Sequence, residues 1–282
     1  MVVIRAIVWQ DEALPFTLAH PAAVLPLRRT RLIFSALVIG SMAPDFPYFL
    51  FASDEMKWGH TLPGVFLFCL PAGLLVLWLY QRVVKRALVA LAPDFVRRRM
   101  SERDFQFRFA PASTFLLIVV SLLIGVFTHL LWDSFTHDNG YFVQIWPWLS
   151  EPVQLHGVHR LFKALQVVCS VIGLGLIGLA VAWSWFKAPL VTDPMAAEFS
   201  PVTRWVVVFL GILVASGVGV AVGIHRHTGH HGWKWTIVQM IIAAISALCA
   251  EIVIYSVAWQ ASRKNKRPRD PQTQGLKVLA ER

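Results

Sequence analysis

The residues best suited to chemistry are histidines and aspartates at the ends of apolar stretches. In GVFTHLLWDSFTH, His129 and Asp133 are four residues apart, a spacing that puts both side chains on one face of a helix. An imidazole and a carboxylate on one face commonly supply two ligands to a divalent metal ion. His137 follows one helical turn later, and Asp138 comes directly after it. The segment therefore predicts His129 and Asp133 as metal ligands, with His137 or Asp138 as a general acid or base.

Similar residue types recur nearer the N-terminus. His20 occurs in PFTLAHPAAVLPLRR, Asp45 in GSMAPDFPYF and His60 in KWGHTLPG. With the helical pair they make three imidazoles and two carboxylates, a ligand set that suits zinc or another first-row metal. Five ligands exceed what one structural zinc takes, but they suit an open catalytic site or a site for two ions. The predicted ligands of one or two divalent ions, zinc first among them, are His20, Asp45, His60, His129 and Asp133.

The composition indicates the environment of these residues. Of the 282 residues, 56% are hydrophobic and only 15% are charged, whereas a soluble protein carries about 25% charged residues. The three cysteines lie far apart in apolar runs, so they predict neither a disulfide framework nor a thiolate metal site. A soluble enzyme, a disordered protein and a secreted disulfide-rich scaffold are therefore excluded. An integral membrane protein remains.

Apolar stretches of membrane-spanning length follow one another along most of the chain. A helix needs about 20 apolar residues to cross the hydrocarbon layer, and five stretches qualify or nearly so: Thr61–Tyr80, Ser113–Trp132, Ala164–Phe186, Trp205–Ile224 and Thr236–Gln260. A less regular sixth element covers Leu32–Phe51, and a short, proline-interrupted one covers Ala13–Leu27. The expected fold is all-α: a polytopic membrane protein with about six spans and a short N-terminal helix. Its expected parts are a membrane domain with the metal site over 14–162, a three-span region over 163–260 and a basic tail over 261–282.

Basic residues predict the orientation. Lys and Arg gather in the turn near residue 30, in 81–112, which has eight of them, and in 261–282, which has seven. The positive-inside rule assigns such segments to the cytoplasm, which leaves the five candidate ligands on the outer side of the bacterial inner membrane. Because ionisable groups are costly at membrane depth, five on one side indicate a shared site.

Four stretches resemble a bacterial family of integral-membrane proteins, domain of unknown function 4184: PFTLAHPAAVLPLRR, SALVIGSMAPDFPYFL, GHTLPGVFLFCLPAGLLVLWLY and SLLIGVFTHLLWDSFTH. The resemblance is close from about residue 15 to residue 143 and looser thereafter. The family is more distantly similar to LexA-regulated inner-membrane proteins described as metal-dependent hydrolases. Those proteins share an early His, a Pro-Asp, a His-Thr pair and a Gly-xxx-His-xxx-Asp, which correspond here to His20, Asp45, His60, His129 and Asp133.

This wider group resembles the zinc-dependent phospholipase C fold, which also uses His-xxx-Asp ligands. The resemblance implies a helical metal site in the N-terminal half and a lipid phosphoester as substrate. The soluble zinc phospholipases have a second pair, His-xxx-Glu, whereas here only His129 has a carboxylate residue four positions later. One or two ions are therefore implied rather than three.

The function expected from these features is a membrane-embedded, metal-dependent hydrolase acting on a lipid-like substrate at the extracytoplasmic side. One alternative is a non-enzymatic membrane protein whose polar cluster is structural, with or without a metal. Another is a transporter of ions or small solutes, although no inverted repeat or pair of broken helices favours it. Membrane lipids are the expected partners. Nucleic-acid binding is not expected, because the basic residues follow the membrane topology.

Other polar residues carry weaker signals. Two interpretations remain for the histidine tract His225–His231: it binds a metal ion at the surface, or it is simply solvated. His156 and His159 are expected to be solvated loop residues. Glu251 is the one formal charge within the five long apolar stretches. At that depth, a structural hydrogen bond is the expectation.

Overall fold

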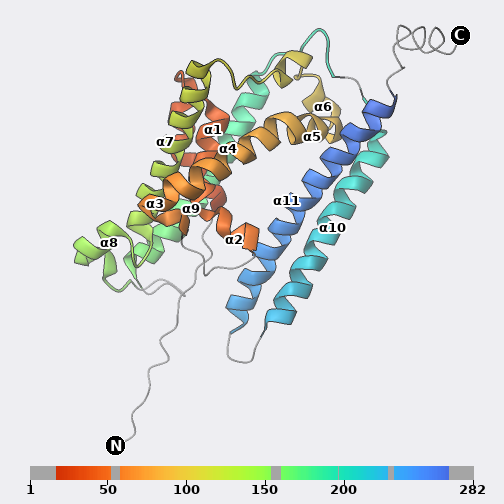
Figure 1. Ribbon diagram of the computed structural model, residues 1–282. Coiled ribbons are helices and arrows are strands. Elements are labelled where there is room, and N and C mark those ends of the chain that lie inside the picture. The colour runs from red at the N-terminus through yellow and green to blue at the C-terminus, as the bar shows by residue number, and fades with distance from the viewer. Residues whose placement is uncertain (1–16, 52–57, 154–159, 196, 228–231, 267–282) are drawn as a thin grey trace, which may run out of the picture.

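The computed structural model describes residues 17–51, 58–153, 160–195, 197–227 and 232–266. Within these ranges the chain forms helices and no strand (Figure 1), so the predicted all-α fold is confirmed. The predictions for His156, for His159, for the second half of the histidine tract and for most of the basic tail lie outside the described residues.

Five helical runs are long and apolar enough to cross a membrane: Leu62–Leu91, Ala112–Ile145, Leu161–Lys187, Pro201–Arg226 and Trp235–Arg263. Four of them contain a predicted apolar stretch and extend beyond it at both ends, whereas the first begins at Leu62, one residue after the predicted start at Thr61, which is its N-cap. The first run continues for eleven residues past the predicted end at Tyr80, because its basic last turns stay helical beyond the apolar part. The chain is therefore a multi-pass membrane protein.

The predicted sixth element is a bent pair of short helices. Helix α1 (Phe34–Gly40) is followed by the 3-10 turn η2 (Ala43–Asp45) and by α2 (Phe46–Phe51), and the two halves are bent by 41°. Prolines flank Asp45 on both sides, and a proline lacks the amide hydrogen that would continue a helix. The break falls at Ser41 and Met42, just before Pro44. If the bent pair is counted as one span, the described residues contain six.

The N-terminal helix η1 (Thr17–Arg29) is a 3-10 helix with Pro21 and Pro26 inside it. A short turn, η3 (Trp58–His60), then leads into the first long run, which consists of α3 (Leu62–Gly64), η4 (Val65–Cys69), α4 (Leu70–Leu79), η5 (Tyr80–Val84) and α5 (Lys85–Leu91). The connection to the next span contains α6 (Asp94–Arg97) and η6 (Glu102–Phe105).

The later spans are more regular. Helix α7 (Ala112–Thr136) is followed by the short α8 (Tyr141–Ile145) and η7 (Pro147–Ser150), then by α9 (Leu161–Lys187), α10 (Pro201–Arg226) and α11 (Trp233–Lys266). Figure 1 shows α10 and α11 as an antiparallel pair beside the other helices. The pair joins them through α11, where Ser246 Oγ donates to the Phe49 carbonyl at 2.7 Å and Gln260 Nε2 donates to the Val83 carbonyl at 2.9 Å.

Helices α1 and α7 cross at two glycines. A Cβ atom on Gly40 would overlap the backbone of Leu122, and one on Gly125 would overlap the backbone of Leu37. Small residues let membrane helices approach this closely and gain backbone packing. The crossing holds the broken element of α1 and η2 against the part of α7 that carries the His-xxx-Asp pair.

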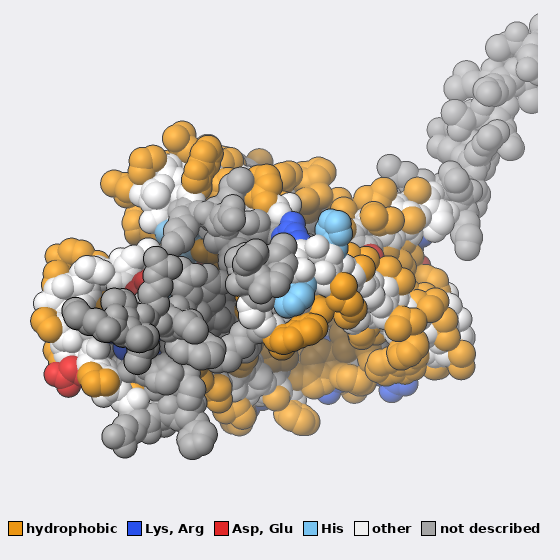
Figure 2. All heavy atoms as spheres, turned by 90° about the horizontal axis from the view of Figure 1, so that it is seen from below, with side chains coloured by type: hydrophobic (Ala, Val, Ile, Leu, Met, Phe, Trp, Pro, Cys, Tyr) orange, Lys and Arg blue, Asp and Glu red, His pale blue; other side chains and the backbone are white. Residues whose placement is uncertain are grey.

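The described surface is mostly hydrophobic. Figure 2 shows apolar side chains over much of the face seen from below, with charged side chains scattered among them. Large apolar residues are more than half exposed on α9 and α10, among them Val171, Leu179 and Phe209. Such exposure is costly in water, but lipid tails are as apolar as these side chains.

Candidate metal centre

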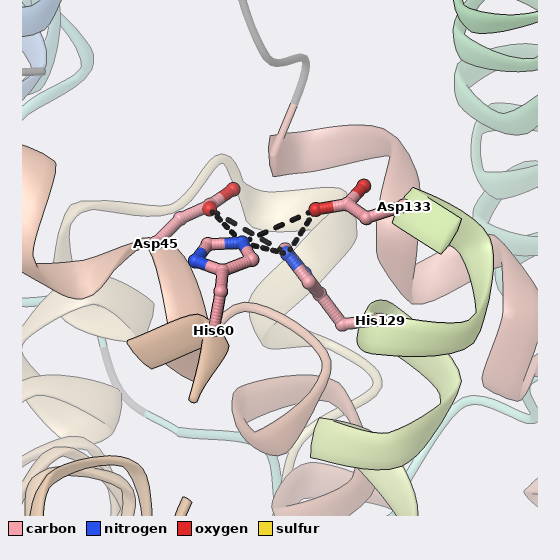
Figure 3. A group of neighbouring side chains, drawn as sticks. All are labelled: Asp45, His60, His129 and Asp133. Carbon is pink, nitrogen blue, oxygen red and sulfur yellow. Dashed lines mark hydrogen bonds and ion pairs between the residues drawn. The ribbon is translucent and has the colours of Figure 1, made fainter. Parts of the chain in front are cut away.

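Four of the five predicted ligands converge in one small group. Asp45 comes from the end of η2, His60 from the end of η3, and His129 and Asp133 from successive turns of α7 (Figure 3). One ligand atom from each lies within 4.8 Å of all the others. Residues far apart in the sequence thus form a cluster that could hold a divalent metal ion.

The separations between these ligand atoms are nearly uniform. His60 Nε2 is 3.2 Å from Asp133 Oδ2, 3.4 Å from Asp45 Oδ1 and 3.3 Å from His129 Nε2. His129 Nε2 is 3.1 Å from Asp133 Oδ2 and 3.5 Å from Asp45 Oδ1. Ligand atoms about 2.0–2.1 Å from a tetrahedral ion lie about 3.3–3.4 Å from one another. Five of the six pairs therefore have the spacing of a tetrahedral site.

Outer contacts orient two of the ligands. His129 Nδ1 is 2.8 Å from the Ser41 carbonyl, so it donates there and leaves the lone pair of Nε2 directed into the cluster. Thr17 Oγ1 donates to Asp45 Oδ2 at 2.6 Å, which leaves Oδ1 facing the two rings. Neither contact was predicted from the sequence. The contact of Thr17 could have been predicted, because Thr17 lies one turn before His20 on the helix that was expected to carry His20 to the site.

The fifth predicted ligand, His20, lies on the other side of Asp133. Its Nε2 is 3.0 Å from Asp133 Oδ1, and its ring stacks on that of His129 with the centroids 3.9 Å apart. Its Nδ1 faces the Thr17 carbonyl at 3.3 Å. The two oxygens of Asp133 therefore face different histidines.

The two candidate acid–base residues differ in position. His137 Nδ1 is 3.4 Å from Asp133 Oδ1, on the same side as His20, and its Nε2 accepts from the amide of Gln166 at 3.2 Å. Gln166 was missed because it lies on α9 and belongs to no motif. Asp138 is exposed, and the one hydrogen bond of its side chain among the described residues comes from the Asn139 amide at 2.8 Å. The structure thus brings His137 to the cluster but not Asp138.

One known protein family matches most of the chain. The model described as Domain of unknown function (DUF4184) matches residues 14–257. The chain belongs to this family. The match includes all five predicted ligands and all the spans up to residue 257, which confirms the family resemblance. No curated protein and no solved structure matches the chain, so similarity to the LexA-regulated proteins stays a prediction.

The cluster in this DUF4184 protein is open on one side. The side chains of Asp45 and His129 are 1% and 0% exposed, whereas those of His60 and Asp133 are 23% and 12% exposed. His137, at 27%, lies beside Asp133 on the open side. A closed shell of ligands is typical of structural metal sites, whereas catalytic sites keep an open position.

The other polar residues singled out from the sequence, His225 and His227 of the histidine tract and Glu251, lie apart from this cluster in the DUF4184 protein. His225 is exposed, and His227 bonds to Thr236 Oγ1 at 2.6 Å and stacks on Trp233. The expected hydrogen bond of Glu251 is absent among the described residues, since both of its carboxylate oxygens are buried without a partner. Glu251 lacks this hydrogen bond because its carboxylate faces Gly211 of α10, which has no side chain to donate one.

Proposed function

We propose that this protein is a membrane-embedded, metal-dependent hydrolase whose substrate is a lipid-like phosphoester. The single observation that carries the proposal is the tetrahedral spacing of two imidazole nitrogens and two carboxylate oxygens at the end of a membrane span. These donors are borderline and hard, a combination that suits zinc. A divalent ion held by them supplies Lewis-acid chemistry: it polarises a phosphoryl or carbonyl oxygen and lowers the pKa of a water molecule.

The protein contributes preorganised ligands. The Ser41 carbonyl holds the ring of His129, and the Thr17 hydroxyl holds the carboxylate of Asp45. Such outer contacts typically change metal affinity about 10- to 100-fold. Because His60 and Asp133 are less deeply buried than the other two ligands, with side chains 23% and 12% exposed, a substrate would approach from their side.

His137 is the candidate for proton transfer. Gln166 donates to its Nε2, so the proton of the neutral ring is on Nδ1, where Thr136 Oγ1 lies at 3.2 Å and Asp133 Oδ1 at 3.4 Å. The ring is thus held next to the open side of the cluster, with a proton available at a defined atom. A positioned imidazole of this kind is a common general acid or base.

A second metal ion could bind next to Oδ1 of Asp133, the oxygen that the four-residue cluster does not use. If His20 Nδ1 donates to the Thr17 carbonyl, the lone pair of its Nε2 faces an oxygen of Asp133 at 3.0 Å. Two acceptors at this distance repel each other unless a proton or a cation lies between them. His20 Nε2 and Asp133 Oδ1 therefore form a candidate second site that shares Asp133 with the first.

The surroundings favour a lipid-like substrate. Helix α8 begins eight residues after Asp133 with Tyr141, which is 66% exposed, and is followed directly by Trp146, which is 38% exposed. Phe142 stacks on Phe135 of α7 at 4.2 Å and contacts Trp146 at 4.8 Å. Aromatic residues of this kind concentrate at the membrane interface. We infer that the open side of the cluster faces the outer interface of the inner membrane.

The test combines metal analysis with lipid hydrolysis. Wild-type protein purified in mild detergent should contain about one or two equivalents of a divalent metal, and Asp133→Asn should lose most of it. His225→Gln is the matched control, since His225 is exposed and outside the cluster. Phospholipid vesicles incubated with each protein are then analysed by mass spectrometry for released headgroups. Wild-type protein without metal would contradict the proposal, and metal without any product would favour a structural role instead.

A further inference from the structure

Helix α8 and the turn η7 present an uncharged, apolar surface next to the metal cluster. The stretch from Asn139 to Ser150 contains no Asp, Glu, Lys, Arg or His. Large exposed apolar patches mark surfaces that bind a protein or a membrane. Four large side chains of this stretch are between 38% and 66% exposed, and together they are named here the aromatic surface: Tyr141, Ile145, Trp146 and Trp148.

The opposite face of the same segment is packed against the protein. Val143 and Leu149 are buried together with Phe162 of α9, and Phe135 of α7 and Phe142 pack against this small core. The segment is therefore a fixed element with one face inside the protein. The aromatic surface is its outward face, so its exposure follows from how the segment packs.

A glycine joins this segment closely to the ligand-bearing end of α7. A Cβ atom on Gly140 would lie 2.8 Å from the carbonyl oxygen of Asp133 and 2.6 Å from that of Ser134, so a larger residue would push the chain away from α7. Gln144 Nε2 also donates to the Asp138 carbonyl at 2.7 Å. The position of the aromatic surface relative to the ligand Asp133 is thus set by backbone contacts.

The length of α7 places Asp133 near the boundary of the hydrocarbon layer. The helix has 25 residues, which rise about 38 Å at 1.5 Å per residue, whereas the hydrocarbon layer is about 30 Å thick. A centred helix therefore projects by about 4 Å on each side. Asp133 lies three residues before the end of α7 at Thr136, or about 4.5 Å along the axis. The segment that follows α7 then lies at the depth of the lipid headgroups.

The opposite end of the spans is different. The connection between α5 and α7 contains an arginine–carboxylate cluster, in which Asp94 Oδ1 accepts from Arg97 Nη2 at 2.5 Å and from Arg204 Nη2 at 2.9 Å. Figure 1 shows α6 of this connection at the end away from α2, α3 and α8. On the metal side, Asp138 and Glu151 are exposed, but the twelve residues between them carry no charge. This stretch can therefore enter the bilayer surface while its two ends stay in water.

We propose that the aromatic surface of α8 and η7 binds the headgroup layer of the leaflet on the metal side and holds the metal cluster at that depth. Tyr and Trp favour this layer because each has an apolar ring and one polar atom that stays hydrated. Lipid is the occupant, because the apolar run Ala112–Ile145 includes both α7 and α8, so the surface directly continues a span. The consequence for the substrate rests on the proposed function: the cluster acts on a phosphoester of a lipid that stays in its leaflet.

Site-directed spin labelling tests the depth of the surface. The full-length protein carries Cys249→Ser, which removes its exposed cysteine, and is reconstituted in vesicles of phosphatidylethanolamine and phosphatidylglycerol. Ile145→Cys and Trp148→Cys are made separately and labelled. Protein without an introduced cysteine gives the background from Cys69 and Cys169. Collisions of each label with oxygen, which concentrates in the bilayer, and with a nickel chelate, which stays in water, give its depth.

Labels at Ile145 and Trp148 should lie about 5–10 Å inside the headgroup boundary. Glu151→Cys is the control for a label in water, because Glu151 is exposed and directly follows η7. Leu179→Cys is the control for a label in the hydrocarbon layer, because Leu179 is 69% exposed on α9. The label at Ile145 should be more accessible to the chelate than the one at Leu179 and less accessible than the one at Glu151.

Chelate accessibility at Ile145 equal to that at Glu151 would overturn the proposal. Spin–spin broadening at Ile145 that disappears on dilution with unlabelled protein would mean that a second copy of the chain covers the surface, which also overturns it. If Trp148→Cys does not fold, Ile145→Cys alone decides. The measurement needs neither bound metal nor hydrolysis, so its outcome is separate from that of the proposed function.

Discussion

The backbone of Gly59 lies directly against the carbonyl group of Pro44, with no room for a side chain between them. Gly59 precedes His60, and Pro44 precedes Asp45, so this contact brings two candidate ligands to within 3.4 Å of each other. Cys69 Sγ lies 3.4 Å from the Gly59 carbonyl and donates to it. The metal cluster thus depends on a backbone contact between two turns, η2 and η3, each of which carries one candidate ligand.

Gly59→Ala should therefore weaken metal binding. Its Cβ would overlap the Pro44 backbone, so η3 must move away from η2 and separate His60 from Asp45. We expect an affinity loss of about 10- to 100-fold, measured by metal titration of the apoprotein in detergent. Gly175→Ala is the control, because a Cβ there meets nothing within 4 Å. Equal affinity in both variants would show that the contact does not position the ligands.

Thr17→Val should also lower metal affinity. It removes the hydroxyl that donates to Asp45 Oδ2 at 2.6 Å while keeping a similar volume. We expect about a tenfold loss by the same titration. Thr17→Ser restores a hydroxyl at the same position and should recover most of the affinity. Failure of serine to recover it would mean that packing, not the hydrogen bond, matters here.

His20→Gln distinguishes one ion from two. His20 faces Asp133 Oδ1, whereas the tetrahedral group uses Asp133 Oδ2. With two ions bound, the variant should lose about one equivalent of metal and keep the other. Elemental analysis against protein concentration gives the count. Unchanged metal content would leave His20 as an outer partner of Asp133 and restrict the site to one ion.

Gly125→Ala should destabilise the fold. A Cβ there would overlap the carbonyl of Leu37, which forces α1 and α7 apart. Overpacking of this kind costs about 1–3 kcal/mol. The thermal midpoint in detergent should fall below that of Gly178→Ala, a helical glycine with open space around it. Similar midpoints for the two variants would contradict the close crossing.

The stability of the arginine–carboxylate cluster should depend on pH. Hydrogen bonds from Arg97 and then from Arg204 lower the pKa of Asp94 below its usual value of 3.8. A carboxyl whose pKa is lowered by folding stabilises the native state above its unfolded pKa, and this contribution is lost as the pH falls through the folded value. The difference in thermal midpoint between wild type and Asp94→Asn should therefore be present at pH 7 and shrink below about pH 4. Because Asp94 is exposed, salt should reduce the difference, and a difference that stays constant down to pH 2 would contradict the assignment.

The spans and the set of candidate ligands could be predicted from the sequence, because both depend on hydrophobicity and spacing within short segments. Hydrophobic stretches of about 20 residues predict spans in any arrangement, and the four-residue spacing of His129 and Asp133 places them on one helix face whatever the helix packs against. Even the meeting of His20, Asp45 and His60 with this pair was predictable in outline, since the order of spans and the basic segments put their ends on one side.

The atomic contacts within the site could not be predicted from the sequence and are determined by the tertiary structure. Side-chain directions set by packing between distant segments determine which oxygen of Asp133 faces which histidine, and they place Gln166 against His137. That the carboxylate of Glu251 has no partner among the described residues depends likewise on a glycine forty residues away in the chain. Local spacing determines which residues share a helix face, but only the contact of one helix with another determines which atoms meet across it.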